Sequence, residues 1–151
     1  IGTKNCYKGY FIRIITRAPV SNTQPDAQND AGYINEDATL TVVDGANAND
    51  ETPDASGEHT GDVINTSSSS NRDTDADGDT LIVNQIRTGS SLGNGTLGTV
   101  GSALTGTYGQ LTMSQDGSYV YIANQSAADA LDPGDTVTDI FNYRIDDQSG
   151  A

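Results

Sequence analysis

Short apolar runs that alternate with polar residues constrain the fold of this chain more than any other feature. They recur along the sequence and are separated by clusters of Gly, Asn, Asp and Ser. A period of two places alternate side chains on the two faces of a β-strand, and the intervening residues favour turns. We therefore expect strands at residues 10–16, 38–43, 80–86, 109–113, 118–123 and 139–145.

The segments between these runs indicate how the strands connect. Asp116 and Gly117 lie between two runs and predict a tight hairpin, because this pair tolerates the positive φ that such turns demand. Residues 67–70 and 89–101 read as flexible loops, and only residues 126–131 suggest a short helical turn. Several strands without a ten-residue helix predict an all-β fold, a β-sandwich.

The composition predicts a thin core that is opposed by charge. Leu, Ile, Val and Phe make up 28 of the 151 residues, and the formal net charge is −14. These values are typical of chains that cannot bury enough apolar surface to fold unaided. The apolar residues nevertheless alternate as in a folded β protein. We therefore expect a bound counter-ion that removes the repulsion between acidic side chains, and calcium suits a chain rich in carboxylates.

The charge divides the chain into two domains. Residues 1–25 carry four basic residues and no acid, whereas residues 26–151 carry a net charge of −18. We interpret residues 1–25 as an extended arm, because Pro19 and Pro25 resist both helix and ladder pairing. Residues 26–151 are the sandwich. The strand expected in the arm consists of Tyr10, Phe11, Ile12, Arg13, Ile14, Ile15 and Thr16.

An acidic motif is the most informative local feature of the sandwich. Asp73, Asp75, Asp77 and Asp79 alternate with other residues, and Gly78 precedes the last of them. This spacing matches the start of an EF-hand loop, in which alternate oxygens surround a calcium ion. The twelfth position is Asn84 rather than a bidentate Glu, so further ligands must come from elsewhere. Residues 36–37 and 146–147 lie at the ends of expected strands, and we expect the missing calcium ligands among them.

Several functional classes are disfavoured. His59 is the only histidine and Cys6 the only cysteine, and no nucleophile–base pair or zinc-protease motif accompanies them. We therefore expect no enzyme activity. The acidity disfavours nucleic acid as a partner, because phosphate binding requires a basic footprint. No apolar stretch has the length needed for membrane insertion.

Motifs in residues 26–147 resemble the VCBS repeat, a cadherin-like or bacterial immunoglobulin-like domain of secreted bacterial adhesins. Residues 35–42, 58–63, 73–80, 104–109, 116–119, 127–131 and 135–143 carry the resemblance, in order. It implies an immunoglobulin- or cadherin-like β-sandwich that is extracellular, located at the cell surface or in a biofilm, stiffened by calcium and without catalysis. It also implies calcium (Ca2+) ligands among Glu36, Asp37, Asp73, Asp75, Asp77, Asp79 and Asp147.

One departure from the family pattern suggests how such a module assembles. Family members continue after the turn at residues 146–150 into a final strand, which is missing here, whereas a run of that character lies in the arm at residues 10–16. We expect a structural subunit that polymerises head-to-tail with copies of itself by donor-strand complementation. Two alternatives stay open: one tandem repeat of a long adhesin, and an arm that folds back into its own sandwich. Other cell-surface or matrix components are possible partners.

Overall fold

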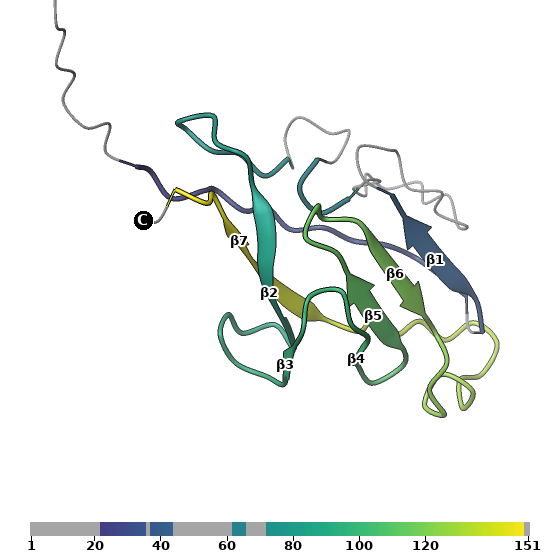
Figure 1. Ribbon diagram of the computed structural model, residues 1–151. Coiled ribbons are helices and arrows are strands. Elements are labelled where there is room, and N and C mark those ends of the chain that lie inside the picture. Colours follow the sequence, from purple (N-terminus) through teal and green to yellow (C-terminus); the bar gives the residue numbers. More distant parts are fainter. Residues whose placement is uncertain (1–21, 36, 44–61, 66–71, 150–151) are drawn as a thin grey trace, which may run out of the picture.

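The computed structural model describes residues 22–35, 37–43, 62–65 and 72–149, and seven β-strands form the framework of this part (Figure 1). No helix occurs in these ranges, and in particular none long and apolar enough to cross a membrane. The strands are β1 (Thr39–Val42), β2 (Ile82–Thr88), β3 (Leu97–Gly98), β4 (Leu104–Thr105), β5 (Gln110–Met113), β6 (Tyr119–Ile122) and β7 (Phe141–Asp146).

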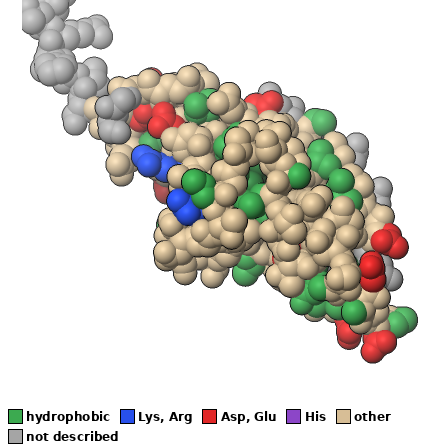
Figure 2. Space-filling view, turned by 60° about the horizontal axis from the view of Figure 1, so that its bottom comes forward, with side chains coloured by type: hydrophobic (Ala, Val, Ile, Leu, Met, Phe, Trp, Pro, Cys, Tyr) green, Lys and Arg blue, Asp and Glu red, His purple; other side chains and the backbone are tan. Residues whose placement is uncertain are grey.

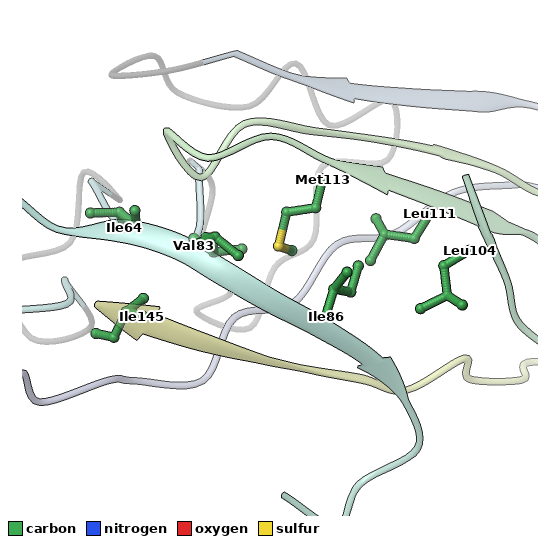
Figure 3. Packing of buried hydrophobic residues seen from close by; sticks show 8 residues of the cluster. Ile64, Val83, Ile86, Leu104, Leu111, Met113 and Ile145 are labelled. Carbon is green, nitrogen blue, oxygen red and sulfur yellow. The ribbon is translucent and has the colours of Figure 1, made fainter. Parts of the chain in front are cut away.

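The strands form two antiparallel sheets. One has the order β1-β6-β5-β4, and the other has the order β3-β2-β7. In Figure 3 the buried apolar side chains fill the space between β2 and β7 on one side and β5 on the other. The predicted all-β sandwich is therefore confirmed.

Five of the six predicted strands correspond to observed ones, namely β1, β2, β5, β6 and β7. The sixth, residues 10–16, lies outside the described residues. The interpretation of residues 89–101 as a flexible loop was wrong in part, because β3 lies within it and pairs with β2. A strand of two residues has no measurable period, so β3 and β4 left no pattern in the sequence. Residues 126–130 form turns rather than a regular helix.

The predicted hairpin joins β5 to β6. The amide of Ser114 donates to the carbonyl of Ser118 at 2.8 Å, and Asp116 Oδ1 accepts the Ser118 amide at 3.0 Å. Gly117 has a φ of +90°, and a Cβ atom at this position would lie 2.8 Å from Asp62 Oδ1. Glycine is therefore required here both by the turn and by the approach of the 62–65 segment.

A bulge in β2 aligns two apolar residues that the simple period of two would separate. Val83 and Ile86 are three positions apart, yet both are completely buried. The pairing of β2 with β7 shifts register between Val83 and Gln85, so that the extra residue restores the inward direction. These residues join one core cluster: Val63, Ile64, Val83, Ile86, Leu104, Leu111, Met113 and Ile145 (Figure 3). Burial of each large member contributes about 1.5–3 kcal/mol.

Candidate functional site

The acidic motif forms a loop that is attached to two other segments. The amide of Asp73 donates to the carbonyl of Ile64 at 3.2 Å, and Thr74 exchanges two main-chain hydrogen bonds with Asp26, at 2.8 and 3.1 Å. Asp73 itself is only 4% exposed. The loop therefore begins in the interior of the domain and emerges toward its surface before β2.

Asp75 organises the curl of the loop. Its Oδ1 atom accepts the amides of Asp77 at 2.8 Å and Asp79 at 3.1 Å, and Gly78 has a φ of +79°. The other carboxylate oxygen, Oδ2, is buried and has no hydrogen-bond partner. A carboxylate oxygen in this state lacks compensation for its lost hydration. The predicted curl of the acidic motif is present, and it leaves one carboxylate oxygen of Asp75 without a hydrogen bond.

The structure brings Asp147 to the same region. Its Oδ1 accepts the amide of Ser149 at 2.9 Å, while the hydroxyl of Ser149 donates to Asp79 Oδ2 at 2.8 Å. Asp77 Oδ2 accepts the amide of Thr23 at 2.8 Å, and Asp147 Oδ2 accepts from Asn22 Nδ2 at 2.6 Å. The turn after β7 and the start of the described chain thus meet at the acidic loop.

Asp37 is not part of this assembly. Its amide donates to the carbonyl of Ala123, just beyond the C-terminal end of β6, whereas Gly117 and the 62–65 segment lie at the N-terminal end of that strand. The sheet therefore separates Asp37 from the loop at residues 73–79. Glu36 lies outside the described residues. Asp37 lies shortly before β1, close to the strand end where it was expected, but strand ends occur on two sides of a sandwich.

A buried group beside the loop was not anticipated from the sequence. Tyr143 Oη lies 3.0 Å from Gln28 O, 2.9 Å from Asp30 Oδ2, 3.3 Å from Val63 O and 3.2 Å from Asp73 Oδ2. A hydroxyl carries one proton, so it satisfies only one of these four acceptors at a time. Asp30 Oδ1 is also buried and has no hydrogen-bond partner.

The crowding of acceptors changes the ionisation of this group. Burial raises the pKa of Asp30 to about 7, opposed by the hydrogen bond from Tyr143 and reinforced by the charges of Asp73 and Asp62. Burial likewise raises the pKa of Asp73 to about 6, although hydrogen bonds from Gln28 and Tyr143 oppose it. Burial, with the neighbouring charges of Asp30 and Asp73, raises the pKa of Tyr143. The group therefore favours either a bound proton or a bound cation.

The carboxylates of this region have the oxygen atoms that a hard cation binds, but they are not arranged as a ready metal site. Within residues 22–35, 37–43, 62–65 and 72–149, no three or more His, Cys, Asp or Glu side chains converge into a ready metal site. However, Asp30 Oδ1 and Asp75 Oδ2 are buried carboxylate oxygens without partners. Calcium takes oxygen ligands of this kind in flexible geometry. Asp75 Oδ2 could bind a cation without breaking a hydrogen bond, whereas both carboxylate oxygens of Asp147 already accept one.

Another carboxylate, Asp139, has a structural role. Its Oδ1 accepts the amide of Thr107 at 2.7 Å, and its Oδ2 accepts the amides of Tyr108 and Gly109 at 2.9 Å each and the Tyr121 hydroxyl at 2.7 Å. Partial burial acts to raise the pKa of Asp139, but these four donors outweigh it and hold the pKa below its ordinary value. Asp139 thus joins the turn before β5 to the segment that leads into β7.

The edge of β7 is the second feature with functional potential. Among the described residues, β2 pairs with one side of β7 and no strand pairs with the other. The carbonyl of Ile140 accepts the Gly89 amide at 2.7 Å on the β2 side. Because main-chain groups alternate in direction along a strand, those of Phe141, Tyr143 and Ile145 point to the other side. Their side chains pack in or against the core, so an added strand would extend the inner face.

Comparisons with known proteins do not assign the chain. No family model matches it. A search of curated proteins also found no match. His59 and Cys6, which the sequence disfavoured as catalytic residues, lie outside the described residues. Within the part of the chain that the structure describes, the acidic loop and the β7 edge are therefore the two candidate functional sites.

Proposed function

We propose that this protein is a non-catalytic structural subunit of an extracellular filament, stiffened by calcium at residues 73–79. In this proposal the β7 edge receives the strand at residues 10–16 of a neighbouring copy. The observation that carries the proposal is the position of β7 at a sheet edge with its apolar side chains directed toward the core. The resemblance to the VCBS repeats of secreted adhesins supports the location outside the cell.

The donor strand and the acceptor are complementary in shape and charge. Tyr10, Ile12 and Ile14 alternate on one face of the arm and match the inward direction of the β7 side chains. Each well-buried apolar side chain contributes about 1.5–3 kcal/mol. The arm carries a charge of +4, whereas residues 26–151 carry −18, so electrostatic attraction favours docking. Main-chain hydrogen bonds to the donor strand would satisfy the open edge of β7, which could otherwise pair with unrelated strands.

The root of the arm disfavours an antiparallel return of the arm to its own β7. Asn22 is held against Asp147, at the C-terminal end of β7. If the strand at 10–16 paired antiparallel with its own β7, its last residue, Thr16, would lie at the N-terminal end of β7. Asn22 lies at the C-terminal end. The six residues from Thr16 to Asn22 would then have to span roughly 20 Å, which requires full extension and leaves nothing for a turn. A strand from another copy has no such tether.

Calcium is proposed at the acidic loop because its carboxylates repel one another. Asp75 offers an oxygen without a partner, its other oxygen accepts the amides of Asp77 and Asp79, and Ser149 links Asp79 to Asp147. A bound divalent cation would supply charge neutralisation there. Because Asp77 and Asp147 also hold the root of the arm, the same residues would set the direction in which the arm leaves the domain.

The test compares the full chain with a chain that begins at Asn22, which keeps the contacts to Asp77 and Asp147. We expect filaments in negative-stain microscopy from the full chain, and less stable monomers from the shortened one. A peptide of residues 8–20 should restore the stability of the shortened chain without restoring filaments. The matched control is the same peptide with Ile12→Asp and Ile14→Asp, which should have no effect.

Two results would redirect the proposal. A shortened chain that is as stable as the full one and still assembles would remove the donor strand from this account. A full chain that remains monomeric, combined with a shortened chain that the peptide stabilises, would mean that the arm folds back into its own sandwich. The open edge of β7 also favours a second candidate function, a tandem repeat in a longer adhesin, since a preceding repeat could fill it.

A further inference from the structure

The outer face of the three-stranded sheet carries two arginines side by side. Arg87 lies opposite Asn142 in the pairing of β2 with β7, and Arg144 lies opposite Gln85. These residues alternate with the core residues Ile86 and Ile145, so their side chains point away from the core. Diagonal neighbours on a sheet face are ~7–8 Å apart, a separation that two long side chains can bridge to a common ligand.

Neither arginine forms an ion pair with a carboxylate within the described part of the chain. Arg87 donates to two neutral oxygens, Gln85 Oε1 at 3.3 Å and Gly95 O at 3.2 Å. The acid nearest in register is Asp146, two residues after Arg144. Its oxygens accept from Asn84 Nδ2 at 3.0 Å and from the amide of Gln148 at 2.8 Å. In a chain with a net charge of −14, two neighbouring arginines without a carboxylate partner among the described residues are unusual.

The chemistry of the pair points to carboxylates. The planar guanidinium group presents several donors that match a carboxylate in a bidentate manner. The amide side chain of Gln85 lies on the same face and adds polar capacity. Leu97 is 56% exposed and lies opposite Arg87 on β3, so the face also offers an apolar contact. A partner for this face would therefore combine acidic groups with an exposed apolar side chain.

A segment of the same chain has these complementary properties. Between β6 and β7, Asp129, Asp132 and Asp135 are all exposed, and Val137 nearby is 38% exposed. Asp135 accepts the amide of Asp132 at 3.1 Å, which keeps the turn compact. In Figure 2 the basic side chains lie together toward one end of the visible face, with acidic side chains beside them, and a further group of acidic side chains lies at the other end without basic neighbours. The acidic group at the far end would meet the arginines between molecules.

We propose that the face around Arg87 and Arg144 docks the acidic turn at residues 129–137 of a second copy. This contact is heterologous, because the two surfaces differ, so each copy offers one surface of each kind and the contact repeats from copy to copy. It goes beyond the proposed donor-strand contact and uses none of its residues: the strand would pair with the edge of β7, whereas the docking surface is the outer face of the sheet. The contact would pack copies side by side.

The test uses the full chain with Ile12→Asp and Ile14→Asp, so that the donor strand does not contribute to association. Sedimentation velocity at low salt measures self-association as the protein concentration rises. Arg87→Glu with Arg144→Glu should weaken it about tenfold, since each exposed ion pair contributes a few-fold and the reversal adds repulsion. Asp129→Lys with Asp132→Lys should weaken it equally. An equimolar mixture of the two double variants should associate again. High salt should weaken the original contact.

The controls make each outcome decisive. Arg72→Glu changes the net charge as much as each single reversal and should leave association unchanged. Circular dichroism confirms that each variant is folded. Association that survives Arg87→Glu with Arg144→Glu overturns the proposal, as does a mixture that fails to associate. A parent chain that does not self-associate but binds dextran sulfate through Arg87 and Arg144 also overturns it, and assigns the face to an acidic polysaccharide.

Discussion

Replacing Asp30 with asparagine should stabilise this protein at neutral pH, although it removes a hydrogen-bonded side chain. In the folded protein Asp30 shares the single Tyr143 proton with Asp73, and its Oδ1 has no partner. Burial raises its pKa from 3.8 to about 7. Asparagine keeps an oxygen for the Tyr143 hydroxyl and removes the charge. The substitution therefore relieves the cost of a partly buried, uncompensated carboxylate.

The magnitude follows from the size of the pKa change. A difference of one pKa unit corresponds to about 1.4 kcal/mol, so about three units would give about 4 kcal/mol. Because Asp30 keeps part of its surface in solvent, we reduce this to about 2 kcal/mol. The folded state binds the proton more tightly than the unfolded chain. Stability should therefore fall as pH rises from about 4 to about 7 and level off above that range.

Thermal unfolding in EDTA at several pH values measures this effect. At pH 8 we expect Asp30→Asn to raise the Tm by about 6 °C, and at pH 4.5 to change it little. Asp129→Asn, at an exposed turn, makes the same change in charge and is the control. A variant that is less stable than the parent at pH 8 would refute the reasoning. So would a variant whose stability declines between pH 5 and pH 8 as steeply as that of the parent.

Three further predictions concern the acidic loop, the Asp139 contact and the hairpin. Millimolar calcium should raise the Tm by mass action, and Asp75→Asn with Asp77→Asn should abolish that rise; an unchanged rise would place the ion elsewhere. Asp139→Asn should cost about 2 kcal/mol in urea unfolding, because charge-assisted hydrogen bonds are lost. The lowered pKa of Asp139 means that its contribution is present above pH 4 and disappears as pH falls below it; an equal cost at pH 3 would contradict this. Gly117→Ala should destabilise by about 1–2 kcal/mol, because alanine resists the positive φ and its Cβ would crowd Asp62; an unaffected urea midpoint would show that the turn can relax.

Local pattern was enough to predict most of the framework. The alternation at residues 118–123 and 139–145 predicted β6 and β7 because each strand is long enough to show its period. Asp116 and Gly117 predicted the hairpin through turn chemistry that depends on adjacent residues alone. The curl around Asp75 could likewise be predicted from the sequence, since its hydrogen bonds to the amides of Asp77 and Asp79 span at most four residues.

Contacts between distant segments could only be decided by the tertiary structure. Asp30 and Asp73 are 43 positions apart and gave no common motif, yet Tyr143 on β7 brings them together. Asp37 shared the acidic composition of the other candidates, but the direction of β1 places it at the far end of β6. Periodicity specifies which face a side chain takes. Sheet order and register specify which faces meet, and these depend on packing energies summed over the whole core rather than on any local run of residues.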